Sequence, residues 1–373
     1  MSVAHPASLP PARGPAVNRS RVERFTDVAI AAFLWALRIA VILVVVVGSF
    51  LTISQGQFTG AAWVGLVIDG LVLGSIYSLI ALGYTMVYGI LRMINFAHGE
   101  IFMAGAFGGY FSGIFLAGAG ILNAHPVLSV LSIIVMICVA AALSVVISLL
   151  VERIAYRPLR NAPRLVPLIS AIGASFVLQY TFRGFLGAGI YAYPDVDFLS
   201  TPLPLPFDFR VRDLLIISSA VVMMAGLYLF VMRTRYGTAM RAVSEDRSTA
   251  VLMGINVDRT IMLTFAIGAA MAGAAGVLYG LLFRQVFYFT GFVPGIKAFT
   301  AAVLGGIGNI PGAMLGGLFL GEVESVGPIL FLDGFGVPST NQLKDVVAFT
   351  MLVLVLVFRP SGILGERVSR QRA

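Results

Sequence analysis

Long apolar runs with few polar interruptions dominate the sequence. A helix needs about 20 apolar residues to cross a bilayer, and eight runs are long enough to read as spans. The runs are continuous, whereas the strands of a membrane barrel would alternate apolar and polar residues over about 10 positions. We therefore expect helical spans near residues 28–53, 64–91, 101–121, 127–150, 166–186, 214–232, 260–283 and 343–358.

A ninth apolar stretch, 296–331, is longer than one span and is broken in its middle by the glycine-rich run 305–312. Irregular backbone at membrane depth is tolerated only where it is buried in protein or lines a watery cavity. This stretch is therefore a candidate piece of a permeation path.

The first apolar run predicts an uncleaved membrane anchor. The apolar region of a signal peptide has about 7–15 residues and is followed by a small-residue cleavage site. The run 28–53 is much longer and leads into Thr52-Ile53-Ser54-Gln55.

The composition agrees with a membrane protein, because 59% of the residues are hydrophobic, 11% are charged and the mean hydropathy is +0.96. Ordinary soluble domains carry about 25% charged residues, and a chain this apolar cannot cover a water-facing surface. A soluble enzyme, a disordered chain and a nucleic-acid-binding module are excluded. The single cysteine, Cys138, excludes an internal disulfide. We expect an all-α polytopic transmembrane helix bundle with eight full spans plus a broken or re-entrant segment near 296–331.

The net charge of +8 is a topology signal. Cytoplasmic loops of membrane proteins carry an excess of Lys and Arg. With a cytoplasmic amino terminus, 18 of the 25 basic residues lie on the cytoplasmic side. The opposite side holds Arg210, Arg212, Arg284, Lys297 and Lys344. The carboxyl terminus is then cytoplasmic only if 296–331 crosses an even number of times, as a re-entrant loop or as two short passes.

We expect three segments: a flexible basic cytoplasmic tail at 1–27, a transmembrane domain at 28–358 with a cytoplasmic loop at 233–259, and a cytoplasmic tail at 359–373. Glycines at four-residue spacing predict close packing of helices, because small residues let two backbones approach. These are Gly70/Gly74, Gly105/Gly109/Gly113, Gly276/Gly280, Gly312/Gly316 and Gly317/Gly321.

Motifs of enzyme chemistry are missing from the sequence. It contains no HExxH zinc motif, no nucleophile elbow and no phosphate-binding loop. We expect no metal and no cofactor, and any ATP that drives the function must be bound by a partner. Ionisable residues inside spans, the usual mark of ion relays, are few. Glu322 and Glu324 are the carboxylates expected to lie deep, and they keep an ion-coupled transporter open as an alternative.

Two polar segments attract attention. In 75–100, Asn95 could cap the following helix and Glu100 would suit its dipole, or the segment could line the cytoplasmic mouth of a path. The loop 233–259 predicts a short helix from about Thr238 to Met253, with Gly254 as its stop. Such a helix either lies on lipid or docks a cytosolic partner, and the acidic residues mixed into it favour docking.

Five segments resemble the signature of bacterial branched-chain amino acid ABC transporter permeases of the LivH type. The resemblance covers roughly 64–366 in the same order. The matching segments are Gly83-Tyr84-Thr85-Met86-Val87-Tyr88-Gly89-Ile90 with Met93-Ile94-Asn95-Phe96-Ala97-His98-Gly99-Glu100, then Ile172–Gln179, Ala242–Asp246 with Ala250 and Met253-Gly254-Ile255, Val303–Gly312 and Phe358–Gly365.

The resemblance implies a permease subunit of an ATP-driven importer in the bacterial inner membrane. Its partners would be a second permease subunit, two cytosolic ATP-binding subunits, a periplasmic substrate-binding protein and membrane lipid, without nucleic acid. The family also carries urea and short amides, so these remain alternatives to branched-chain amino acids. The loop would be the coupling helix in a groove of the ATPase, with Arg241, Ala242, Glu245, Asp246 and Gly254 as its coupling residues.

Transport would then proceed by alternating access along a central path through the bundle. The candidate residues lining this path are Tyr84, Asn95, Ser170, Ser175, Gln179, Thr300 and Asn309.

Overall fold

The computed structural model describes residues 21–365 except 161, 164 and 360. Of the expected tails at 1–27 and 359–373, residues 1–20 and 366–373 lie outside the described residues. Within the described chain, nine helical segments are long and apolar enough to cross a membrane, and all eight predicted spans are among them. Their helices are α1 (Arg21–Gln55), α2 (Gly60–Leu91), α3 (His98–Gly118), α4 (Pro126–Val151), α5 (Leu165–Leu186), α6 (Val211–Arg233), α9 (Val257–Phe283), α11 (Ile310–Leu332) and α12 (Lys344–Phe358).

Shorter elements connect these spans. Strand β1 (Tyr191–Ala192) pairs antiparallel with β2 (Gln285–Val286), so that Tyr191 lies opposite Val286. The other elements are α7 (Arg235–Glu245), α8 (Arg247–Leu252), α10 (Phe292–Gly305), the π-helical turn η1 (Glu152–Tyr156) and the 3₁₀ turns η2 (Arg157–Leu159), η3 (Asp197–Ser200), η4 (Asp333–Phe335) and η5 (Thr340–Leu343).

Most of the paired glycines lie where helices cross, as predicted, whereas Gly280 packs against the Tyr193 ring in the loop after β1. At the crossing of α2 and α11, a Cβ on Gly74 would lie 2.8 Å from the Leu318 Cα, and a Cβ on Gly321 would meet the backbone of Gly70 and Gly74. A side chain at these positions would push the helices apart, and the dispersion contacts that hold helices together in lipid would be lost.

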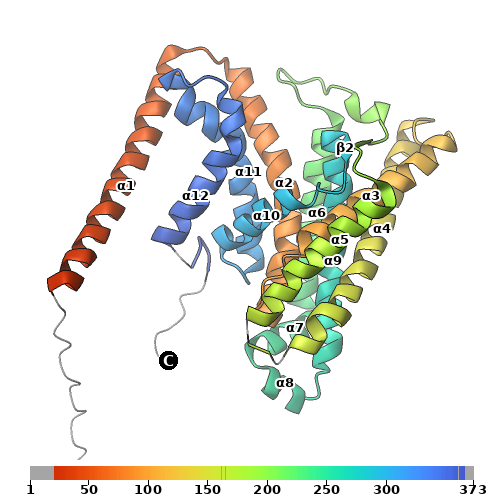
Figure 1. Cartoon of the computed structure of the whole chain (residues 1–373). Helices are drawn as coiled ribbons and strands as arrows, with labels where there is room; N and C mark the ends of the chain where they lie inside the picture. The colour runs from red at the N-terminus through yellow and green to blue at the C-terminus, as the bar shows by residue number, and fades with distance from the viewer. Residues whose placement is uncertain (1–20, 161, 164, 360, 366–373) are drawn as a thin grey trace, which may run out of the picture.

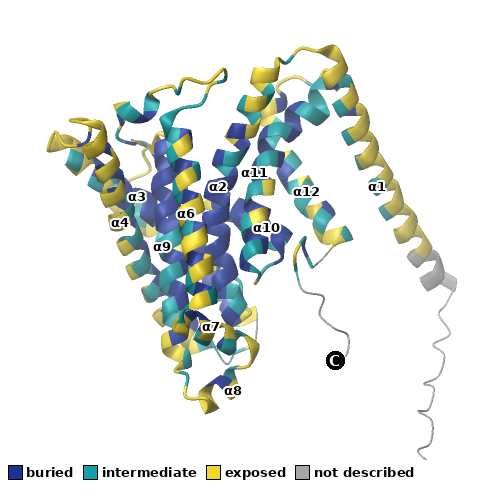
Figure 2. Ribbon diagram, turned by 180° about the vertical axis from the view of Figure 1, so that it is seen from behind, coloured by how far each residue is buried: buried dark blue, intermediate teal, exposed yellow. Residues whose placement is uncertain are grey.

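Glycines also allow close packing of α3, α4 and α9 at the centre of the molecule. A Cβ on Gly105 would meet the Gly273 backbone, and one on Gly276 would lie 2.6 Å from the Ala106 amide nitrogen. Figure 2 shows α2, α3 and α9 as the most buried helices, with exposed residues on the helices around them. The core of the bundle is therefore formed by these three helices together with α11.

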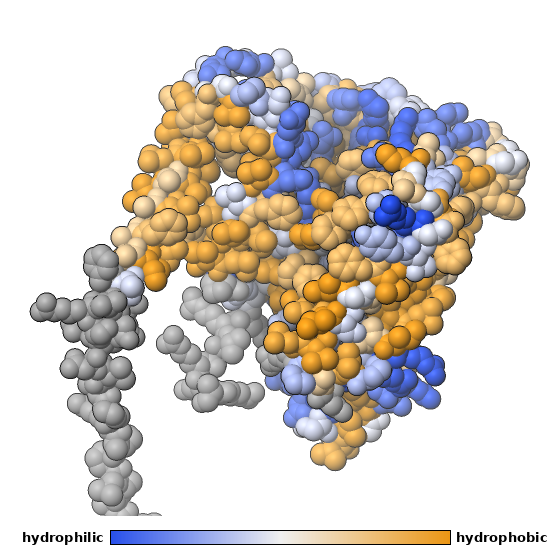
Figure 3. Space-filling view, viewed as in Figure 1, coloured by the Kyte–Doolittle hydropathy of each residue, from blue (hydrophilic) through white to orange (hydrophobic). Residues whose placement is uncertain are grey.

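Helices α1 and α12 lie at the periphery: most described side chains of α1 are exposed, and the buried residues of α12 are Ala348 and Leu354. One end of α1 is fixed to the end of α11, where the Gly334 amide donates to Thr52 Oγ1 at 2.8 Å and Gln55 Nε2 donates to the Gly334 carbonyl at 3.1 Å. Figure 3 shows apolar side chains covering α1 and the middle of the bundle, with hydrophilic residues gathered mainly at its two ends. This distribution fits a protein surrounded by lipid.

The broken stretch forms a hairpin of unequal helices. Helix α10 has 14 residues and α11 has 23, which gives lengths of about 21 and 35 Å at 1.5 Å per residue. Only α11 is long enough for the hydrocarbon core of about 30 Å. In Figure 1, α1 begins and α12 ends toward the side of the molecule that carries α7 and α8. The hairpin therefore returns the chain to the side from which it entered, in line with an even number of crossings.

The turn of this hairpin is held by the end of the described chain. Gly306 and Gly308 have φ values of +106° and +97°, a region that L residues with a side chain rarely adopt. The Ile363 and Leu364 amides donate to the carbonyls of Leu304 and Gly305 at 2.8 and 3.0 Å. The glycine-rich run is thus packed against residues 361–365.

Candidate functional site

The loop between α6 and α9 forms a compact projection at one end of the bundle, which we call the knob (residues 235–254). The single helix predicted over 238–253 is wrong, because the helix breaks at Asp246 into α7 and α8. The Asp246 carboxylate accepts the Ser248 and Thr249 amides at 2.8 and 3.1 Å and so caps α8. The Ser248 hydroxyl also donates to this carboxylate, at 2.6 Å. Hydrogen bonds from Ser248 and Thr249, of which the one from the Ser248 hydroxyl has the largest effect, lower the pKa of Asp246 to about 2.

The end of the knob presents apolar side chains to the surroundings. Val251, Leu252 and Met253 are 57%, 86% and 77% exposed. Gly254 follows with a φ of +80° and ends the helix as predicted. A projecting apolar tip on a polar end of the molecule is typical of a binding surface.

The other face of the knob is fixed to the bundle. Arg247 Nη2 donates to the Ile90 carbonyl at 2.8 Å, and Arg92 Nη2 donates to the Ser244 carbonyl at 3.3 Å. Ile90 lies in the last turn of α2, where carbonyls lack helical partners. The knob is therefore bonded to the end of α2, one of the most buried helices.

The candidate coupling residues occupy both faces of the knob. Arg241, Glu245, Asp246 and Gly254 are exposed, and Ala242 is half-buried against the apolar core. Arg241 contacts Met232 in the last turn of α6 and Thr238 in α7. Four of the five are thus accessible to a partner.

Two candidate path residues converge on Glu100, a carboxylate of the 75–100 segment that the sequence analysis did not name as a path residue. Ser175 Oγ and Gln179 Nε2 on α5 lie 3.5 and 3.4 Å from Glu100 Oε1 on α3. Glu100 is 1% exposed and Gln179 is 2% exposed. The expectation that Glu322 and Glu324 are the deep carboxylates is confirmed for Glu324, which is buried, but it is wrong for Glu322, which is half-buried, and it missed Glu100.

Tyr84 and Asn95 lie in the same region, but in separate contacts. The Tyr84 ring meets His98 edge-on at 4.8 Å and Phe299 at 5.7 Å between ring centroids. Asn95 Oδ1 accepts the Ala97 amide and the Tyr156 hydroxyl, both at 3.1 Å. The expected cap of α3 by Asn95 is therefore wrong, because the N-cap residue is Ala97 and no side chain caps this helix; Asn95 instead stabilises the turn that precedes it.

The other three candidates make bonds within the scaffold. Ser170 donates to the Ala155 carbonyl at 3.1 Å, and Thr300 donates to Ile296 in its own helix at 2.9 Å. Asn309 caps α11 by accepting the Gly312 amide at 3.0 Å. The structure does not bring these residues together with Glu100.

A buried ion pair links three helices. Lys297 Nζ of α10 lies 2.7 Å from Glu324 Oε1 of α11, and the Tyr77 hydroxyl of α2 donates to the same oxygen at 3.3 Å. Lys297 also lies 2.6 Å from Asp345 at the start of α12. Sequence reasoning counted Lys297 as a loop charge, because nothing local marks it as the partner of Glu324.

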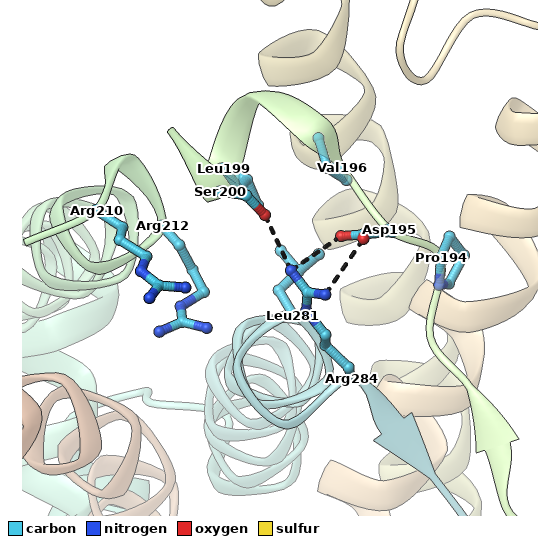
Figure 4. A pocket seen from close by; sticks show the side chains of 9 residues that line it. All are labelled: Pro194, Asp195, Val196, Leu199, Ser200, Arg210, Arg212, Leu281 and Arg284. Atoms are coloured by element: carbon cyan, nitrogen blue, oxygen red, sulfur yellow. Dashed lines mark hydrogen bonds and ion pairs between the residues drawn. The ribbon is translucent and has the colours of Figure 1, made fainter. Parts of the chain in front are cut away.

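A small depression at the opposite end from the knob holds three of the five basic residues counted on that side (Figure 4). Arg284 pairs with Asp195 at 3.2 Å and Arg212 with Asp213 at 3.1 Å. The Arg210 guanidinium holds the pKa of Asp208 below its usual range. Each of these arginines has a carboxylate partner, so the depression carries little excess positive charge.

The segments that resemble one family lie against one another in space. Val303–Gly312 and Phe358–Gly365 meet at the hairpin turn, and the 83–100 segment contacts both the knob and the 172–179 segment through the bonds described above. Residues far apart in the sequence thus form one connected region.

Comparison with known proteins finds the same family that the five sequence segments resemble. A sequence model of the family described as branched-chain amino acid transport system / permease component matches residues 66–356. The chain is 46% identical over 309 residues to the high-affinity branched-chain amino acid transport system permease protein BraD of Pseudomonas aeruginosa, covering 80% of this chain and 94% of that protein.

Two further relatives come from a bacterium and from Methanocaldococcus jannaschii. The LivH protein of Escherichia coli K12, with the same description, is 43% identical over 314 residues, covering 80% of this chain and 94% of its own. A probable branched-chain amino acid transport permease protein LivH of Methanocaldococcus jannaschii is 28% identical over 311 residues, with 80% and 92% covered. No solved structure matches the chain.

Proposed function

The chain belongs to the family of branched-chain amino acid transport permeases, as its motifs predicted, and we propose that it is the membrane subunit of an ATP-driven importer for these amino acids. It is a multi-pass membrane protein and a transport subunit, and ATP hydrolysis takes place on its partners. The observation that carries the proposal is the family match across 66–356, which begins in α2 and ends in α12.

The complete importer combines this chain with a second permease subunit, two cytosolic ATP-binding subunits and a periplasmic substrate-binding protein in the bacterial inner membrane. The absence of a phosphate-binding loop in the sequence supports an external source of ATP hydrolysis. The excess of basic residues on the knob side supports a cytoplasmic position for the knob and for both termini.

The knob couples ATP hydrolysis to transport. Its apolar tip, Val251–Met253, docks into a groove of an ATP-binding subunit, and Glu245 and Arg241 contact the rim of that groove. Closure of the ATPases displaces the knob, and Arg247 and Arg92 pass this displacement to the end of α2. Since α2 packs tightly on α11 through glycines, the two helices move together.

Substrate crosses by alternating access. The loaded binding protein releases its amino acid into a path within the bundle, and hydrolysis returns the bundle to its inward-open form. The path residues supported best are Ser175 and Gln179, because they lie beside a buried carboxylate, followed by Tyr84 and Asn95. Ser170, Thr300 and Asn309 are kept as weaker candidates, since their polar atoms bond within the scaffold.

The source of energy tests this proposal. Vesicles that contain the permease with its ATP-binding subunits are expected to transport labelled leucine only under two conditions. ATP must be present on the side of the membrane that carries the ATP-binding subunits, and loaded binding protein must be present on the other side. Vesicles with the permease alone are expected to take up none under a proton or sodium gradient. Uptake by the permease alone under such a gradient would identify an ion-coupled transporter, with Glu322 and Glu324 as its coupling carboxylates.

A further inference from the structure

Glu100 differs from the other buried glutamates of the described chain. Glu152 pairs with Arg160, and Glu324 pairs with Lys297. Glu100 is as deeply buried, at 1% exposed, yet it forms no ion pair among the described residues. A carboxylate without a counter-charge is costly inside a membrane protein. Apart from the partial positive charge at the N-terminus of α3, the described residues give Glu100 no cationic partner.

The geometry leaves one carboxylate oxygen open. Ser175 Oγ and Gln179 Nε2 both approach Oε1, at 3.5 and 3.4 Å. Oε2 is fully buried and has no hydrogen-bond partner in the described chain. Two neutral donors do not neutralise a carboxylate, so the open oxygen is positioned to accept a charged donor.

The position of Glu100 in the bundle allows access through a helix that is lightly packed. Glu100 lies on α3, in the core, and its partners lie on α5, whose only buried residues are Pro167, Ala171 and Gln179. Ala171, Ser175 and Gln179 are spaced four residues apart and so line one face of α5. The two side chains that approach Glu100 are thus carried by a helix with few other buried residues.

We infer that Glu100 binds the α-ammonium group of the amino acid during its passage, with Ser175 and Gln179 as neutral donors that hold the carboxylate. This inference rests on the proposed function and refines it. An ammonium group brings three donors and the missing positive charge. Urea and short amides bring no charge, so the site favours amino acids over these alternatives.

The test compares two changes at Glu100 in the complete complex, reconstituted in vesicles with its ATPases and binding protein. Glu100→Gln keeps the shape and removes the charge, and we expect leucine uptake to fall about tenfold or more, the effect of losing a hydrogen bond between charged groups. Glu100→Asp shortens the side chain and keeps the charge, and we expect it to retain more uptake than Glu100→Gln. A purely structural role predicts the opposite order.

A third variant remains informative if Glu100→Gln does not assemble. Gln179→Lys places a fixed ammonium beside Glu100, which supplies the missing cation and competes with that of the substrate. We expect this variant to assemble and to lose uptake. The concentration of loaded binding protein that half-saturates its binding to the complex is expected to stay unchanged. Asp333→Asn serves as the matched control, because it removes a half-buried carboxylate of η4 outside the proposed site, and its uptake is expected to equal that of the wild type.

The outcomes separate the two proposals. Wild-type uptake from Glu100→Gln or from Gln179→Lys, with ATP-dependent leucine uptake intact in the unmodified complex, overturns the role of Glu100 and leaves the importer standing. Absence of ATP-dependent leucine uptake in the unmodified complex overturns the importer, and the role of Glu100 with it.

Discussion

Replacing Lys297 by methionine tests whether the charges buried among α2, α10, α11 and α12 hold these helices together. Lys297 and Glu324 are 2.7 Å apart, and their side chains are 7% and 6% exposed. Methionine keeps the apolar stem and removes the charge, so Glu324 is left buried with the Tyr77 hydroxyl as a neutral donor. Removing one partner of such a pair costs about 3–5 kcal/mol, because the remaining charge is uncompensated.

Unfolding of the purified chain in lipid nanodiscs, followed by denaturant titration, measures this loss. The double change Lys297→Met with Glu324→Leu is expected to recover most of it, since apolar replacement of a whole buried pair is neutral or stabilising. Asp345→Asn removes a carboxylate that also contacts Lys297 but is 57% exposed, and a pair of this kind contributes about 0–1 kcal/mol. The reasoning is refuted if Lys297→Met destabilises the chain no more than Asp345→Asn.

Three further predictions address the knob and the glycine crossings. Leu252→Glu places a charge on the tip of the knob, where Leu252 is 86% exposed. We expect the thermal unfolding of the permease to stay unchanged and the stimulation of ATPase activity by loaded binding protein to be lost. Full stimulation would contradict docking through the tip. Gly74→Ala should destabilise the bundle by about 1–3 kcal/mol through overpacking against Leu318, whereas Gly226→Ala, with open space around it, should not, and equal unfolding midpoints for the two would contradict this packing. Folding favours the ionised form of Asp246, because its pKa is lowered to about 2. The cap of α8 is therefore complete above the ordinary pKa near 4 and is lost as the pH falls through about 2. Hydrogen-exchange protection factors across 246–252 that stay constant between these pH values would contradict the cap.

The membrane spans could be predicted from the sequence because their signal is local. A run of about 20 apolar residues has few structural alternatives, and each of the eight runs became a helix of the bundle. The four-residue glycine spacing was also informative, since Gly74 and Gly321 meet across the same crossing. The spacing of glycines within one helix predicts that another helix packs closely on its backbone, but it does not predict which helix that is.

The charges of the site could not be predicted in the same way, because each depends on a partner on another helix. Lys297 and Glu324 are on different helices and pair only through the α10–α11 hairpin. Glu100 lies 75 residues from Ser175 in sequence, so its burial against α5 follows from packing and not from the 98–100 segment alone. The break at Asp246 had a local signal that was missed, since Asp is a preferred N-cap residue and it precedes Ser248 and Thr249.

Accumulation of labelled leucine and labelled urea, measured side by side in vesicles that hold the complete complex, tests the central claim most directly. The account predicts that leucine rises above its external concentration with ATP and loaded binding protein, and that urea does not. Accumulation of urea without leucine, under the same conditions, would contradict a branched-chain amino acid importer.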